Sequence, residues 1–220
     1  MKLKYYFQIN WLKTFYINFS TLPLKSAIKL PIVLFYRTVI RSLKGKIIID
    51  APVSHGMIKI GRADVSHWQY AHTILDINGM VHFAGKATVG RGSALVVNRG
   101  GKLVTGKKFR ITAGTTILCE KSITIGDNFL SSWDNLIMDS DHHDIFSSTN
   151  ELLNAPRPVT IGNHVWLGCR CTLLKGSVIP DDCVVASGSV ITKAFSEKSA
   201  IIGGSGKNQL VLKSDIIWRE

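Results

Sequence analysis

Residues 161 to 193 place an aliphatic side chain at every sixth position, which is neither the period of a helix nor that of a strand. The six positions are Ile161, Leu167, Leu173, Ile179, Val185 and Ile191. This period predicts a coil folded as a triangular prism, in which each face is one short strand and the sixth-position side chains stack inward. Ordinary strands would alternate with period two and need hairpin turns that this stretch lacks.

The same period continues upstream in pieces. The six-residue period is kept at Thr105, Ile111, Ile117 and Ile123. After a slip of two residues, the period continues at Ile125, Ser131, Ile137 and His143. Such slips indicate bulges or corner insertions. The largest interruption is residues 144–157, and a loop of that length in a compact repeat domain is usually functional or mobile. We expect an N-terminal segment over 1–50, the prism with its loop over 51–205, and a C-terminal tail over 206–220.

The closing part of the chain resembles the hexapeptide-repeat acyltransferases. The residues that carry the resemblance are Ile161-Gly162, Val165-Trp166-Leu167-Gly168, Lys175-Gly176 and Ser187-Gly188-Ser189-Val190. Two positions depart from the family pattern, because Pro180-Asp181 replaces the usual Gly-Asp or Gly-Asn pair and Ser187 replaces the usual Ala. The resemblance implies an all-β fold, a left-handed parallel β-helix, here preceded by a short helical, amphipathic segment. It also implies acetyl transfer from acetyl-CoA and a homotrimer with shared sites.

The expected chemistry is concentrated in residues 135–143. Transfer of an acyl group to a hydroxyl needs a base, and imidazole titrates near neutral pH. In the resembling sugar acetyltransferases an Asn precedes the catalytic His by eight positions, which matches Asn135 and His143. The resemblance thus makes His143 the general base and Asn135 a hydrogen-bonding residue, with Asp141 orienting the imidazole or contacting the acceptor. His142 and Asp139 are expected to bind the acceptor, although the two histidines could exchange roles.

The resemblance also implies a site for the acetyl-CoA donor. In the family the pantetheine arm lies between the coils of neighbouring subunits, near the last hexads, and a basic residue meets phosphate. The matching positions are Trp166, Gly168, Ser187, Gly188 and Lys193. No metal is expected.

The N-terminal segment is strongly basic. Residues 1–50 hold nine Lys or Arg against one acid, Asp50, with aromatic residues interleaved. The longest apolar run, residues 30–36, is too short to span a bilayer. Two interpretations stay open: the segment lies among the headgroups of an anionic membrane, or it covers the open strand edge of the first coil. Nucleic acid is not expected, because no binding motif accompanies the charge. Without an apparent signal peptide, we expect a cytoplasmic protein, and under the membrane interpretation it lies at the inner face of the membrane.

The leading interpretation is an acetyl-CoA-dependent O-acetyltransferase that acts on a saccharide acceptor, in the biosynthesis of a surface polysaccharide. The alternatives are an N-acetyltransferase acting on an amino sugar, a zinc enzyme like the γ-class carbonic anhydrases using His67 and His72, and a non-catalytic scaffold. The four cysteines lack CxxC spacing, so we expect free thiols, buried in a reducing cytosol. Their positions are Cys119, Cys169, Cys171 and Cys183, and a Cys nucleophile is a minor alternative.

Overall fold

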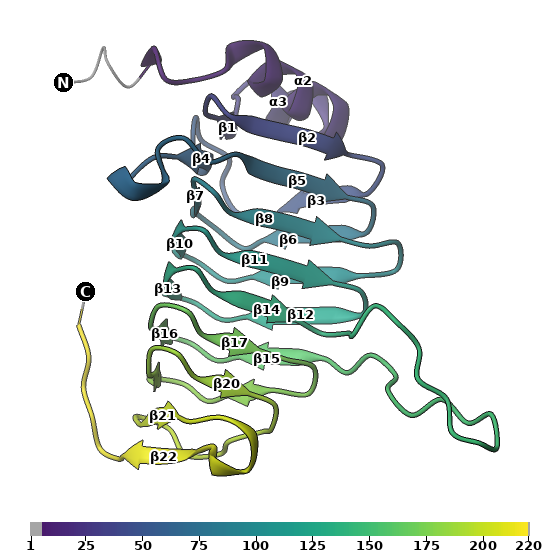
Figure 1. Ribbon diagram of the computed structural model, residues 1–220. Helices are drawn as coiled ribbons and strands as arrows, with labels where there is room; N and C mark the ends of the chain where they lie inside the picture. Colours follow the sequence, from purple (N-terminus) through teal and green to yellow (C-terminus); the bar gives the residue numbers. More distant parts are fainter. Residues whose placement is uncertain (1–5, 220) are drawn as a thin grey trace.

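The chain winds into a three-sided β-helix in which each coil adds one strand to each of three sheets (Figure 1). The computed structural model describes residues 6–219. The first sheet contains β1 (Ile32–Leu34), β4 (Ile58–Arg62), β7 (Ala87–Gly90), β10 (Phe109–Ala113), β13 (Leu130–Trp133), β16 (Trp166–Leu167), β19 (Val184–Val185), β21 (Ile201–Gly203) and β22 (Leu210–Lys213). The second contains β2 (Thr38–Ser42), β5 (Thr73–Ile77), β8 (Ala94–Val97), β11 (Thr116–Cys119), β14 (Leu136–Met138), β17 (Thr172–Leu173) and β20 (Val190–Ile191). The third contains β3 (Lys46–Ile49), β6 (Met80–Phe83), β9 (Lys102–Thr105), β12 (Ser122–Ile125), β15 (Val159–Ile161) and β18 (Val178–Ile179).

Three corners follow from this order. The first corner joins the first sheet to the second, the second corner joins the second to the third, and the third corner returns the chain to the first sheet. Strands of neighbouring coils are parallel, and the last pair, β21 with β22, is antiparallel. The described residues include no helix long and apolar enough to cross a membrane.

The predicted inward column is confirmed. All six aliphatic residues of the period are at most 1% exposed. Leu167 pairs with Val185 and Leu173 with Ile191, so a closing coil takes 18 residues. Each such side chain removed from water contributes about 1.5 to 3 kcal/mol, so the column forms a core without helices.

The slip of two residues is not a bulge, and that expectation was wrong. Ile123 and Ile125 are both buried on strand β12, with Thr124 between them facing out. Strand β12 pairs in unbroken register with β9 and β15. A four-residue strand therefore offers two inward positions, and the six-residue period had followed first one and then the other.

The β-helix begins earlier than the expected boundary at residue 51, since β1, β2 and β3 already belong to the three sheets. The predicted N-terminal helical segment is present as helix α2 (Trp11–Thr21), followed by the short helix α3 (Leu24–Ala27). The side chain of Asn10 caps α2 by accepting a hydrogen bond from the backbone N–H of Lys13 at 3.1 Å. Helix α2 packs on β1 at one end of the stack (Figure 1).

Candidate functional site

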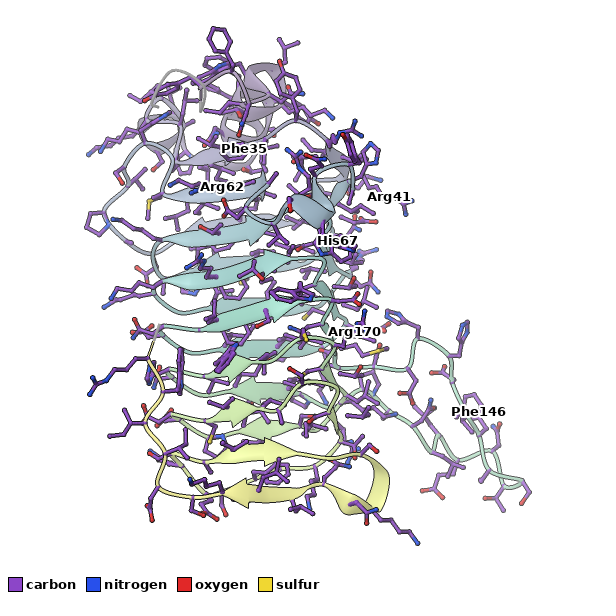
Figure 2. All side chains as sticks on the ribbon, turned by 60° about the vertical axis from the view of Figure 1, so that its left-hand side comes forward. Phe35, Arg41, Arg62, His67, Phe146 and Arg170 are labelled. Atoms are coloured by element: carbon purple, nitrogen blue, oxygen red, sulfur yellow. The ribbon has the colours of Figure 1, made fainter. Side chains whose placement is uncertain are left out.

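The loop between β14 and β15 projects away from the prism at the second corner (Figure 1). It folds back on itself, because Phe146 and Leu152 form an antiparallel bridge and the N–H of Leu153 donates to the carbonyl of Ile145 at 2.8 Å. Ile145, Phe146, Leu152 and Leu153 are each at least 40% exposed. Figure 2 shows this arm, with Phe146 labelled, extending into solvent. An arm with apolar side chains on the outside is suited to packing against another surface.

The base of the loop is held by three side chains. Nζ of Lys175 lies 2.5 Å from Oδ2 of Asp141 and donates to the carbonyl of Asn154 at 2.7 Å. Nδ2 of Asn154 donates to Asp141 and to the carbonyl of His143. The hydrogen bond from Lys175, followed by that from Asn154, lowers the pKa of Asp141 below its ordinary value. Asp141 thus fixes the backbone that carries His143, and within the described residues its carboxylate does not bond to either imidazole.

The two histidines have different environments. His142 has a positive φ of 61°, and its Nδ1 lies 3.4 Å from a carboxylate oxygen of Glu120, which also accepts a hydrogen bond from Ser140. His143 is exposed, and in the described part of the chain its ring makes no hydrogen bond. It also lies outside the six-residue register, which ends at Ile137, so the register argument for it was wrong. His142 is therefore held against the prism, whereas His143 is free to meet a ligand.

Asp139 was expected to bind the acceptor, and its environment corrects this. The side chain is fully buried, and its carboxylate accepts the backbone N–H groups of Glu120, Lys121 and Ser122 at 2.7, 2.8 and 2.6 Å. These three residues turn the preceding coil around the same corner. Asp139 is thus a structural anchor between two coils, with no surface left for a substrate.

Asn135 is also buried and also bonds between coils. Its Nδ2 donates to Oγ of Ser131 at 2.8 Å, and its Oδ1 accepts the N–H of Cys171 at 2.6 Å. Among the described residues it has no hydrogen bond to either histidine. Asn135 would therefore affect a reaction only indirectly, by fixing the coil that leads into the loop. It is a positioning residue and not a catalytic one.

The residues expected to bind CoA line a different part of the prism. Trp166 lies on the first sheet, 36% exposed, and its Nε1 donates to Oγ of Ser132 at 3.0 Å. At the first corner, Gly168 is buried, and a Cβ on it would stand 2.6 Å from Oγ of Ser187, so only glycine fits there. Ser187 and Gly188 are exposed beside it, and Gly188 has a φ of 75°.

Lys193 lies at the second corner, and its Nζ is 5.1 Å from the centre of the Phe195 ring. His143 is also at the second corner, two coils earlier, whereas Ser187 is at the first corner. One chain therefore does not bring the candidate base and most of the candidate CoA residues together. The sequence did not reveal Asn154 as a site residue, because its contacts form only when the loop is folded. Lys175 belongs to the Lys175-Gly176 motif, but nothing in the sequence indicated that it holds the loop.

The comparisons with known proteins agree with this architecture. Residues 158–193 match the family described as bacterial transferase hexapeptide (six repeats). Residues 158–193 thus carry hexapeptide repeats of the kind found in bacterial transferases. This hexapeptide-repeat chain is 29% identical over 126 residues to a polysialic acid O-acetyltransferase of Escherichia coli O1:K1, covering 56% of this chain and 40% of the relative. It is 31% identical over 96 residues to the galactoside O-acetyltransferase of Escherichia coli K12, covering 43% and 46%.

A solved structure shares the fold. The crystal structure of a polysialic-acid-specific acetyltransferase superposes with a TM-score of 0.62 at 22% identity, covering 85% of this chain and 78% of that one. This likeness confirms the predicted fold class, an all-β, left-handed parallel β-helix. The hexapeptide-repeat chain spans only about half the length of the curated relatives that it matches, between 40% and 57% for three of them.

The zinc alternative finds no support in the geometry of the hexapeptide-repeat chain. His67 lies on the short 3-10 helix Ser66–Trp68, with its ring edge-on to Trp68 at 5.9 Å. In residues 6–219, no three His, Cys, Asp or Glu side chains gather in a way that could hold a metal ion.

All four thiols of the hexapeptide-repeat chain are free, as predicted. Burial raises the pKa of Cys119, with the nearby carboxylate of Asp139 adding to the shift, to about 12, and burial raises that of Cys171 to about 11. Because the thiolate is the reactive form, neither is suited to be a nucleophile. Cys169 alone of the four is half-exposed.

We therefore expect iodoacetamide at pH 8 to alkylate one thiol per folded chain quickly, and peptide mapping to place it at Cys169. A Cys169→Ser variant should lose the fast reaction, while all four thiols should react once guanidinium unfolds the chain. Fast alkylation of Cys171 in the folded protein would show that its surroundings are more open than described.

Proposed function

We propose that the protein is an acetyl-CoA-dependent O-acetyltransferase that acts on a saccharide, with His143 as the general base. One observation carries the proposal: a projecting loop presents an exposed histidine directly before the coils that match the bacterial transferase repeats. The names of the relatives, which include polysialic acid and galactoside O-acetyltransferases, support a sugar acceptor. One relative named as a putative lipopolysaccharide O-acetyl transferase supports a role in surface polysaccharide biosynthesis.

The mechanism assigned to this chain is general-base catalysis. The imidazole of His143 takes the proton from the acceptor hydroxyl as the hydroxyl oxygen attacks the thioester carbonyl. The carbon–sulfur bond breaks, the acetyl group becomes an ester of the sugar, and the imidazolium returns the proton to the leaving sulfur. Lys175, Asp141 and Asn154 hold the loop backbone so that the base meets the acceptor in a fixed position.

The separation of the two half-sites supports a shared site. His143 and Lys193 lie at the second corner, whereas Trp166, Ser187 and Gly188 lie on the first sheet and first corner. We infer a homotrimer with three-fold symmetry, in which the second corner of one subunit faces the first corner of the next. The exposed apolar residues of the loop provide a contact for the neighbouring subunit. Because the donor is an intracellular metabolite and the thiols are free, we place the protein in the cytoplasm, at the inner face of the membrane.

Calorimetry with CoA tests the donor half of this proposal. We expect CoA to bind the wild-type protein, and Ser187→Trp to weaken binding at least about tenfold, because an indole at this exposed position would occupy the space proposed for the donor. His143→Ala should bind CoA like the wild type. If a folded wild-type protein shows no heat of binding with CoA at low salt, the transferase proposal is wrong.

A further inference from the structure

The inward side of helix α2 is mixed, because Ile17 joins the hydrophobic core while two polar residues lie beside it. Thr14 and Asn18 are fully buried and face the free edge of β1. Nδ2 of Asn18 donates to the carbonyl of Ile32 at 2.7 Å, and its Oδ1 accepts the N–H of Ile32 at 3.1 Å. Oγ1 of Thr14 accepts the N–H of Leu34 at 3.0 Å. Side chains thus satisfy backbone groups of a strand that has no neighbouring strand of its sheet on the outer side.

The opposite side of the helix is apolar and faces solvent. The residues that we call the α2 outer face are between 36% and 85% exposed: Trp11, Leu12, Phe15, Tyr16 and Phe19. The rings of Trp11 and Phe15 have centroids 6.3 Å apart, and those of Phe15 and Phe19 are 6.4 Å apart. Tyr6 stacks on Trp11 and extends the row. Single exposed apolar residues are common, but a continuous row of this kind marks an interaction surface.

The charge around this surface identifies its partner. Residues 1–49 contain no Asp or Glu, and Lys25 and Lys29 are exposed beside the exposed side chains of Leu24 and Ile28. A second copy of the same end would bring like charges together, which opposes association. An anionic lipid surface offers both an apolar layer for the rings and negative charge for the cations, and Trp and Tyr favour the region where the two meet.

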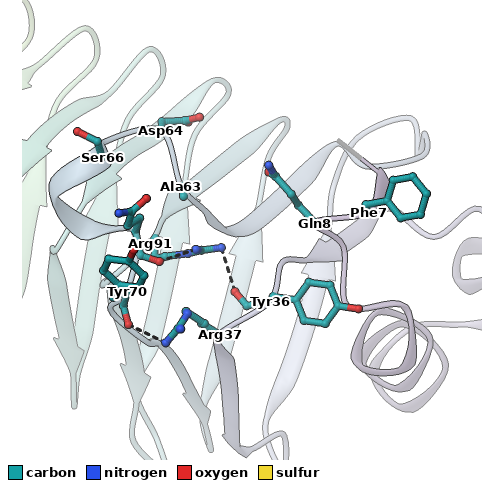
Figure 3. Close-up of a pocket in the computed structure, with 10 residues that line it drawn as sticks. Phe7, Gln8, Tyr36, Arg37, Ala63, Asp64, Ser66, Tyr70 and Arg91 are labelled. Atoms are coloured by element: carbon teal, nitrogen blue, oxygen red, sulfur yellow. Dashed lines mark hydrogen bonds between the residues drawn. The ribbon is translucent and has the colours of Figure 1, made fainter. Parts of the chain in front are cut away.

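A pocket of about 500 Å³ opens on the side of the prism next to this end (Figure 3). Its walls include the exposed rings of Phe7 and Tyr36 together with two guanidinium groups. Arg91 is fixed by donating to the carbonyls of Gly61, Gln69 and Tyr36, and Arg37 donates to the carbonyl of Tyr70. These arginines add positive charges of fixed position to the same end.

We propose that the α2 outer face inserts into the headgroup region of an anionic membrane, with the β-helix standing on the membrane by its N-terminal end. The helix then has two functions, because one side closes the first coil and the other side binds lipid. The loop with His143 lies four strands further along the second sheet, which at about 4.8 Å per strand places it roughly 20 Å from the first coil. This inference does not depend on the proposed acetyl transfer.

Co-sedimentation with vesicles tests the proposal. The protein should pellet with phosphatidylcholine vesicles in which about 30% of the lipid is the anionic phosphatidylglycerol. It should not pellet with pure phosphatidylcholine, and binding should weaken as salt is raised, since salt screens the cations. Leu12→Gln/Phe15→Gln should lower the partition coefficient by at least about tenfold, because two inserted apolar side chains are lost.

The matched control is Leu210→Gln/Ile217→Gln, which removes two exposed apolar side chains near the other end of the stack. This variant should bind vesicles like the wild type. Circular dichroism of both variants checks folding, which the exposed positions should preserve. The proposal is overturned if wild-type protein does not bind anionic vesicles, or if Leu12→Gln/Phe15→Gln binds them equally well. It is also overturned if that variant only reduces the oligomer size without affecting vesicle binding, since the surface would then join copies of the chain.

Discussion

Replacing His143 with alanine is expected to lower turnover about 100- to 10,000-fold, because general-base catalysis typically contributes that much. CoA affinity should stay nearly unchanged, since the imidazole is not at the corner proposed to hold the donor. His142→Ala should have a smaller effect, mainly on the KM for the acceptor, because His142 is held against Glu120 and we propose that it only lines the acceptor site. Steady-state kinetics with acetyl-CoA and a sugar acceptor measure both. A larger loss for His142→Ala would move the base to that residue.

Mixing two impaired variants distinguishes a site shared between two subunits from a site contained in a single chain. His143→Ala should be nearly inactive as a homotrimer, and Ser187→Trp should be strongly impaired when acetyl-CoA is kept well below the Kd of that variant. In randomly mixed trimers, about a quarter of the interfaces combine an intact second corner with an intact first corner, so roughly a quarter of the wild-type activity should return. No recovery from well-mixed trimers would place the base and the donor site within one chain.

Replacing the fully buried Asp139 with alanine is expected to cost about 3 to 5 kcal/mol of the free energy of unfolding, because three backbone N–H groups lose their carboxylate acceptor together. That is a large part of the 5 to 15 kcal/mol that is typical of a domain. The midpoint of urea unfolding, followed by circular dichroism, should fall accordingly. Asp141→Ala is the matched control, since the Asp141 carboxylate is 41% exposed and its ion pair should contribute less than about 1 kcal/mol. Equal midpoints for the two variants would contradict the anchoring role of Asp139.

The β-helix could be predicted from the sequence because the closing coils repeat the same six-residue spacing of inward aliphatic side chains. An inward aliphatic side chain every six residues leaves few alternatives, and Leu167 and Val185 meet as the period requires. The roles of polar residues were harder to predict, since Asp139 and Asp141 look alike in sequence. Only the fold shows that the first binds the N–H groups of the preceding coil and that the second binds Lys175.

Helix α2 shows a second limit of pattern reading. An amphipathic helix normally buries its apolar side, but this one buries Thr14 and Asn18 beside Ile17, because the polar pair bonds to backbone groups at the edge of β1. The sequence could state the two interpretations of this segment, as a cap or as a membrane element. It could not show that opposite sides of one helix are available for both.

A parallel β-helix has no intrinsic stopping point, since each finished coil presents a strand edge that is a template for the next. In this molecule the two ends are closed by different means. Strand β22 runs antiparallel to β21 beyond the last coil, and at the other end Thr14 and Asn18 occupy the edge of β1. These two polar side chains therefore keep the β1 edge of the first sheet from pairing with the strand of another molecule. A helix that covered this edge with apolar side chains alone would leave the backbone groups of β1 open to a foreign strand.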